Sequence, residues 1–291
     1  MTTNERISAQ SLYHPGRATL LAHASEVVYR GPARVESMTQ RHWGESDFRF
    51  FDIDSTQCSL AANYDEIVVC FRGTEKKLDD WVIDLDCSLV SGPLGGKVHQ
   101  GFYDALAMVW GALHETVAKL MAERPRQLWL TGHSLGGALA MLAAAKWTDE
   151  GMPVTGIHTF GQPRVGDNEF ARNYDFKLRQ RSFRHVNHLD IVTRTPPRAM
   201  GYSHAGTLVY FTENGEVEHD GTWWRKFLSG WCGAFENILD WCGEGVRDHR
   251  MTEYVAILES IAPAMAPQGA PRLSLYAPPG SLLAPRRRRA A

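Results

Sequence analysis

Short apolar runs alternate with longer segments of helical periodicity along most of the chain. Apolar residues at three- and four-residue spacing predict helices over Ala18–Val28, Phe102–Met121 and Leu135–Trp147. Runs rich in β-branched and aromatic residues predict strands over these segments: Phe48–Ile53, Cys58–Ala62, Ile67–Phe71, Leu128–Leu130, Ile157–Phe160 and Phe183–Val186. This alternation is typical of an α/β fold with a mostly parallel central sheet and helices on both faces.

The composition of the 291 residues fits a globular protein, with 44% hydrophobic and 22% charged residues. We expect a single domain over residues 1–262. From Pro263 onward, prolines, small residues and an arginine cluster replace the periodic pattern. This change predicts a disordered Pro/Arg-rich tail over 263–291.

The formal net charge of −2 gives no general electrostatic reason to bind nucleic acid. We also expect no transmembrane segment, because no stretch is apolar enough. The N-terminus lacks the basic start and apolar run of a secretion signal. The five cysteines are an odd number without metal-ligand spacing. These features favour reduced thiols in a cytoplasmic protein, with leaderless export as the alternative.

The sharpest chemical signal is Gly132-His133-Ser134-Leu135-Gly136, a G-x-S-x-G sequence between a predicted strand and a predicted helix. A sharp strand-to-helix turn projects the serine above the sheet, and the glycines allow the backbones to approach closely. This context predicts Ser134 as a nucleophile. The alternative is a glycine-rich turn in which Ser134 only caps the helix.

A serine hydroxyl needs a base and an orienting acid, which follow in the order Ser, Asp or Glu, His in hydrolases with this turn. Asp190 lies on the loop after the strand Phe183–Val186, where open sheets place their sites. Asp167 follows an earlier strand, in a context more typical of a helix cap. Asp190 is therefore the candidate acid, although a loop acid that caps a turn is its structural alternative.

Three histidines follow Asp190 and compete for the role of base. His249 begins a helical segment whose apolar positions, Met251, Tyr254, Val255 and Leu258, would anchor it on the sheet. His204 opens a predicted strand and is expected to pack or cap locally, whereas His219 sits in a polar stretch. The residues alone leave His249 and the other two histidines open as alternatives.

Metal chemistry is a further alternative, because His185, His188 and Asp190 are ligand types that suit zinc. His185 and Asp190 would flank a strand end, and no second cluster supplies a fourth ligand. We therefore expect no metal and no cofactor.

Seven ordered segments between Ile67 and Leu258 resemble the class 3 lipase family, the fungal-type triacylglycerol lipases of the α/β-hydrolase fold. They are Val69–Thr74, Asp80–Leu85, Val98–Phe102, Thr131–Ala138, Thr159–Gly166, Asp190–Val192 and Asp248–His249. The resemblance implies the α/β-hydrolase fold and a triad of Ser134, Asp190 and His249. It also implies an oxyanion hole formed by Thr74 and the backbone N–H of Leu135. His204 matches a structural segment upstream of the catalytic histidine.

The function that the resemblance implies is serine-dependent hydrolysis of acyl esters of lipids of the triacylglycerol type, through an acyl-enzyme. The expected substrate is a lipid ester at a membrane or droplet interface. Phospholipase A1 or general carboxylesterase activity on the same triad is the enzymatic alternative. A catalytically silent lipid-binding member is the alternative from another class.

Two segments are candidates for a lid over the active site. Residues 75–90 correspond to the amphipathic lid of fungal members. In residues 222–244, aromatic and aliphatic residues recur at helical spacing and give one apolar stripe. A core helix is the alternative for the second segment, because amphipathic helices usually face the core.

Overall fold

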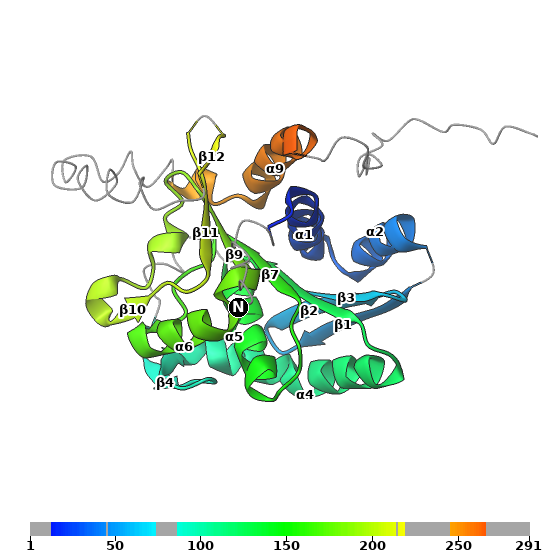
Figure 1. Cartoon of the computed structure of the whole chain (residues 1–291), viewed down its shortest axis with the longest axis horizontal. Coiled ribbons are helices and arrows are strands. Elements are labelled where there is room, and N and C mark those ends of the chain that lie inside the picture. Colours follow the sequence, from blue (N-terminus) through cyan, green and yellow to red (C-terminus); the bar gives the residue numbers. More distant parts are fainter. Residues whose placement is uncertain (1–12, 45, 74–85, 214, 219–244, 266–291) are drawn as a thin grey trace, which may run out of the picture.

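The computed structural model describes residues 13–44, 46–73, 86–213, 215–218 and 245–265. An eight-stranded sheet forms its centre, with the strand order β1-β2-β3-β6-β7-β9-β11-β12 (Figure 1). Its strands are β1 (Asp47–Ile53), β2 (Thr56–Ala62), β3 (Glu66–Phe71), β6 (Gln127–His133), β7 (Gly156–Phe160), β9 (Ser182–Asn187), β11 (Thr207–Phe211) and β12 (Val217–Glu218).

The middle of this sheet is parallel and both of its ends are antiparallel. Strands β3, β6, β7, β9 and β11 pair in parallel, whereas β1 and β2 at one end and β12 at the other run antiparallel to their neighbours. The carboxyl ends of the parallel strands therefore meet along one edge, where open α/β sheets carry their sites.

Helices cover both faces of the sheet, as Figure 1 shows for α1, α2 and α9 on one side and α4, α5 and α6 on the other. Their bounds are α1 (Pro15–Val27), α2 (Pro32–Trp43), α4 (Gln100–Glu123), α5 (Leu135–Asp149), α6 (Asn168–Leu178) and α9 (Met251–Met265). The predicted α/β fold is confirmed. None of the helices in the described ranges combines the length and the apolar character needed to cross a bilayer.

The core consists of separate apolar clusters on the two faces. On the α4/α5 face, the buried positions of α4 and α5 pack against β3 and β6. On the opposite face, residues of α1 and α9 enclose the aromatic side chains of Phe160, Phe183 and Phe211. Helix α5 is buried almost all round, which explains why its sequence is so rich in alanine and leucine.

The structure contains elements that the periodicity did not reveal. Helix α2 buries only Val35 and Thr39, and few of its residues are apolar. A second, antiparallel sheet has the order β10-β8-β5-β4. Its strands are β4 (Leu89–Ser91), β5 (Lys97–His99), β8 (Gly166–Asp167) and β10 (Tyr202–Ser203), which are too short to show a period of two.

Several sequence predictions concern segments that lie partly or wholly outside the described residues. Of the candidate lid over 75–90, residues 75–85 lie outside the description, and Leu89 and Val90 form part of β4. The candidate lid over 222–244 lies wholly outside it. Helix α9 continues to Met265, three residues beyond the predicted domain boundary, and the rest of the predicted tail lies outside the described residues.

Candidate active site

Ser134 occupies the sharp turn between β6 and α5. Its backbone has φ 58° and ψ −128°, in the left-handed region that side-chain-bearing residues rarely adopt. The turn is fixed from outside, because the Ser134 N–H donates to the Phe160 carbonyl on β7 at 2.9 Å. Such strain persists only where the surrounding structure holds it, and it is common at functional sites.

Two glycines make this turn sterically feasible. A Cβ on Gly132 would lie 2.3 Å from the backbone of Gly136, and a Cβ on Gly136 would lie 2.1 Å from the carbonyl oxygen of Phe71. These contacts are with backbone atoms, which cannot rotate away. The close approach of β3, β6 and α5 therefore depends on glycine at both positions.

The Ser134 side chain does not cap the helix. Ser134 stands at the N-cap position of α5, yet its side chain makes no capping hydrogen bond. Its Oγ is buried and has no hydrogen-bond partner among the described residues. A buried hydroxyl without a partner carries a cost for stability, which is typical of a group retained for chemistry.

Asp190 and His249 form a buried pair. Asp190 lies on the loop after β9 and is fully buried, and His249 lies in the turn that precedes α9. The distance from His249 Nδ1 to each carboxylate oxygen of Asp190 is 2.9 Å. Because Nδ1 faces a carboxylate, we assign the proton to Nδ1, which leaves the Nε2 lone pair free to accept. Nε2 is buried and has no partner among the described residues.

The Asp190 carboxylate is held in its charged form. Burial by itself would raise the pKa of Asp190, but the charge and hydrogen bond of His249 and a hydrogen bond from Tyr254 outweigh that effect and lower it. Tyr254 Oη donates to Oδ2 at 2.6 Å, and the Val192 N–H donates to Oδ1 at 3.0 Å. The carboxylate is thus fixed from three directions.

His133, the residue before Ser134, connects the turn to His249. Its ring centroid lies 4.5 Å from that of His249, and its Nε2 lies 2.6 Å from the His249 carbonyl oxygen. Nε2 must carry the proton to donate to a carbonyl, so Nδ1 accepts from Tyr29 Oη at 2.9 Å. Burial, followed by the neighbouring His249, lowers the pKa of His133 to about 3. His133 is therefore neutral, and it contacts His249 through its ring and through the hydrogen bond from Nε2.

Further contacts bring the base and the acid to the end of β7. A Cβ on Gly161, directly after β7, would lie 2.8 Å from both Asp190 Oδ2 and His249 Nδ1. The loop of Asp190 is also tied to Asp248, since the Leu189 N–H donates to Asp248 Oδ2 at 3.1 Å. Ser134 donates to Phe160 and Gly161 contacts the pair, so all three candidate residues meet at the carboxyl end of β7.

Of the two oxyanion-hole candidates, one is described. Leu135 is the first residue of α5, and its N–H belongs to the first helical turn, which has no intrahelical acceptors. Thr74 lies outside the described residues. The residue before it, Gly73, lies beside the serine, because a Cβ there would be 3.3 Å from Ser134 Cβ.

The competing residues have other roles or fall outside the description. Asp167 caps α6 by accepting from the Phe170 N–H at 2.8 Å. Burial and the nearby Arg184 and Arg164 hold the pKa of His204 well below its usual value, so His204 is a neutral residue beside two buried arginines. His219 is not among the described residues.

The three residues of the metal alternative do not converge. His185 Nδ1 lies 3.0 Å from the Thr159 carbonyl oxygen, His188 pairs with Asp248 at 3.3 Å, and Asp190 faces His249. Within the described part of the chain, no group of three histidine, cysteine or acidic residues is arranged to hold a metal ion.

Comparisons with known proteins place these features in context. A family model described as lipase (class 3) matches residues 68–200. A lipase of Rhizomucor miehei is 40% identical over 155 residues, which are 51% of this chain and 42% of the relative. Secreted mono- and diacylglycerol lipase 1 of Fusarium solani is 34% identical over 203 residues, which are 68% of this chain and 57% of the relative. The chain thus spans about half the length of these relatives.

A solved structure shows the same likeness over most of its length. It is a fungal lipase–inhibitor complex with 30% sequence identity and a TM-score of 0.57, and the match covers 72% of this chain and 82% of that one.

The expectation of a cytoplasmic protein is wrong, because close relatives such as the Fusarium solani lipase are named as secreted enzymes. The thiols do not argue against this correction. Cys58 and Cys70 are free and buried. Burial raises the pKa of Cys70 to about 12, which keeps its thiol unreactive in any compartment. Free cysteines therefore did not indicate a compartment here.

Proposed function

The chain belongs to the class 3 lipase family, with the α/β-hydrolase fold, and from this premise we propose that it is a serine-dependent lipase that hydrolyses acyl esters of lipids of the triacylglycerol type. The observation that carries the proposal is the buried His249–Asp190 pair beside a strained serine. Both the serine Oγ and the histidine Nε2 are buried without partners among the described residues. The names of the relatives as lipases support the same activity.

In the proposed reaction, Ser134 Oγ attacks the ester carbonyl while His249 Nε2 takes the serine proton. Asp190 stabilises the imidazolium that forms and holds the ring orientation. The Leu135 N–H, at the positive end of α5, stabilises the oxyanion, together with Thr74. Protonated His249 then returns its proton to the leaving alcohol, which leaves an acyl-enzyme for water to hydrolyse by the same steps in reverse order.

The substrate class is tested by an activity profile over p-nitrophenyl esters of increasing acyl length, together with an emulsified triglyceride and a phospholipid. Preference for long-chain esters and the triglyceride supports the proposal. A preference for the phospholipid would favour phospholipase A1 activity, and activity on short soluble esters alone would favour a general carboxylesterase. Binding of lipid with no hydrolysis of any substrate would indicate a catalytically silent member. The relative named as secreted supports an extracellular location.

A further inference from the structure

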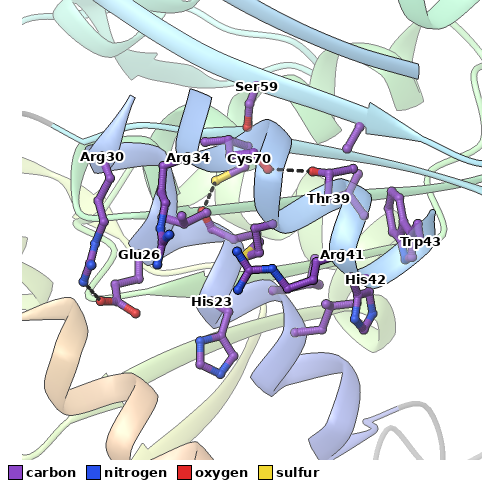
Figure 2. A pocket seen from close by; sticks show the side chains of 18 residues that line it. His23, Glu26, Arg30, Arg34, Thr39, Arg41, His42, Trp43, Ser59 and Cys70 are labelled. Carbon is purple, nitrogen blue, oxygen red and sulfur yellow. Dashed lines mark hydrogen bonds and ion pairs between the residues drawn. The ribbon is translucent and has the colours of Figure 1, made fainter. Parts of the chain in front are cut away.

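A cavity of about 680 Å³ lies between α1, α2 and the sheet (Figure 2). Its size falls within the roughly 300–1,000 Å³ typical of small-molecule sites. Ser134, Asp190 and His249 do not line it. On the side of the sheet, three small side chains line the cavity, namely Ser59 and Ala61 on β2 and Cys70 on β3.

Apolar side chains form one part of the cavity wall. Its walls include aliphatic side chains from three elements: Leu20, Leu21, Val27, Val35, Met38 and Val68. Two of the polar groups in this wall have partners within the protein. The Cys70 thiol donates to the Ala24 carbonyl oxygen at 3.3 Å, and Thr39 Oγ1 donates to the Val35 carbonyl oxygen at 3.0 Å. The interior therefore suits an apolar ligand segment rather than a polar one.

The mouth of the cavity carries unbalanced positive charge. Arg34 and Arg41 lie seven residues apart on α2, so they share one helix face, and both line the cavity (Figure 2). Neither has an acidic partner among the residues that the structure describes, and Arg41 donates only to Ser37 Oγ at 3.2 Å. The one acidic side chain that lines the cavity, Glu26, is engaged by Arg30 at 2.7 Å.

We propose that this cavity binds a free long-chain fatty acid, with its carboxylate between Arg34 and Arg41 and its chain against the apolar wall. Guanidinium groups bind a carboxylate through charge-assisted hydrogen bonds. The cavity thus carries a non-catalytic site for an anionic amphiphile. The choice of a fatty acid among such amphiphiles rests on the proposed function, since ester hydrolysis releases it.

Trp43 lines the cavity and provides a local optical probe. The experiment titrates 9,10-dibromostearate, whose bromine atoms quench nearby indole fluorescence, into the Ser134→Ala protein. This variant performs no turnover, so the result does not depend on whether the proposed lipase activity is correct. We expect saturable quenching, and we expect its amplitude to fall when Trp43 is replaced by Phe.

Variants on α2 test the role of charge. Replacing Arg34 and Arg41 together by Gln should weaken binding at least about tenfold, because a hydrogen bond to a charged group is lost at each position. Arg172→Gln is the matched control, because Arg172 is an exposed arginine on α6, on the other face of the sheet. Ala61→Phe should abolish binding by filling the cavity, with the melting temperature measured to confirm that the protein is folded.

Three outcomes would overturn the proposal. The first is unchanged affinity in the Arg34→Gln/Arg41→Gln protein, and the second is equal quenching by 9,10-dibromostearyl alcohol, which has no charge. The third is loss of quenching in the wild-type protein after a phosphonate has blocked Ser134, which would assign the ligand to the active site. Catalytic activity plays no part in any of these readouts, so failure of this proposal is distinguishable from failure of the proposed function.

Discussion

Tyr254 donates a hydrogen bond of 2.6 Å to Oδ2 of Asp190, the carboxylate that also faces Nδ1 of His249. The same tyrosine hydroxyl accepts from the Asn187 N–H at 2.9 Å. Tyr254 lies in the first turns of α9, five residues after His249. One side chain therefore ties the helix that follows the candidate base to the strand and the loop that carry the candidate acid.

We predict that Tyr254→Phe lowers kcat and shifts the pH dependence of activity. The hydrogen bond from Tyr254 is one of the effects that lower the pKa of Asp190, so its loss raises that pKa. The carboxylate is then protonated at a higher pH as the solution is acidified. The acidic limb of the kcat/KM profile therefore moves to higher pH. The Asn187 N–H also loses its acceptor, so we expect about 1–3 kcal/mol less stability.

The control for this prediction is Tyr103→Phe, which removes a tyrosine hydroxyl from α4, a helix that carries none of the three candidate triad residues. The acidic limb of the pH profile separates a positioning role from a merely structural one. A Tyr254→Phe enzyme that is less stable but keeps the wild-type pH profile would show that Tyr254 only supports the fold.

We predict that Ser134→Ala removes activity without loss of stability. Loss of the nucleophile typically lowers kcat by several orders of magnitude. The Ser134 hydroxyl is buried without a partner among the described residues, so its removal breaks no hydrogen bond there. The melting temperature should stay the same or rise. More than about a tenth of the wild-type kcat in a folded variant would refute the nucleophile assignment.

Ser25→Ala is the control, because it removes a serine hydroxyl that does have a hydrogen-bond partner. Ser25 Oγ lies 2.9 Å from Thr131 Oγ1 in a buried hydrogen bond between α1 and β6. Its removal should cost about 1 kcal/mol of stability and leave kcat unchanged. The two serine variants are compared by kcat and by thermal unfolding.

The histidine assignment makes a comparative prediction. His249→Ala should be about as damaging as Ser134→Ala, and Asp190→Asn should lower kcat roughly a thousandfold or more, because the imidazolium loses its orienting charge. His204→Ala should act mainly on stability, since His204 lies beside Arg184 and Arg164. The kcat values of the three purified variants check this, and an inactive His204→Ala beside an active His249→Ala would mean that the base is misassigned.

The sequence predicted the layers of the fold because the buried strands β3, β6, β7 and β9 contain short segments with β-branched and aromatic residues, which alternate with helical patterns. It did not predict α2, because that helix has few apolar residues and buries only two of its side chains. For that reason it could not predict the cavity below that helix. The short strands of the second sheet could not be predicted from the hydrophobic pattern either, because two or three residues show no alternation.

The candidate triad could be predicted because the order of the motifs limits the choices. The residues that position the triad could not be predicted from the sequence. Tyr254 was recognised only as an apolar position that anchors α9, because a hydroxyl partner 64 residues away is set by the tertiary fold. His133 precedes Ser134 in the motif, but its contact with the His249 carbonyl depends on where α9 begins.

A buried neutral histidine should make the protein sensitive to acid. Burial, followed by His185 and Arg17, holds the pKa of His158 well below its usual value. The unfolded chain binds a proton there as the pH falls below about 6.5, whereas the folded protein does not. Stability contributed by this group is therefore present above that pH and declines as the pH falls, by at most about 1.4 kcal/mol per pH unit.

The test is His158→Phe, which keeps an aromatic ring beside Phe183 and His185. Urea unfolding between pH 4.5 and 7 should show a shallower pH dependence of the unfolding free energy in the variant than in the wild type. Equal slopes would mean that His158 takes up a proton in the folded state.

The last prediction concerns two glycines that both lie in helices but have opposite surroundings. A Cβ on Gly136 would lie 2.1 Å from the Phe71 carbonyl oxygen, and relief of that clash requires α5 to move away from β3. Such a movement displaces the Leu135 N–H and the Ser134 turn. We therefore expect Gly136→Ala to lower both stability and kcat, even where the protein still folds.

Gly111→Ala on α4 is the matched control, because a Cβ there meets nothing within 4 Å. Alanine is preferred to glycine within a helix, so this variant should be more stable by roughly 0.5–1 kcal/mol, with unchanged kcat. Circular dichroism melting and kcat on a soluble ester measure both effects. Because the amino-acid change is the same, the difference between the two variants isolates the contact with Phe71. If Gly136→Ala retained wild-type kcat and stability, α5 would not depend on that close approach to hold the Ser134 turn.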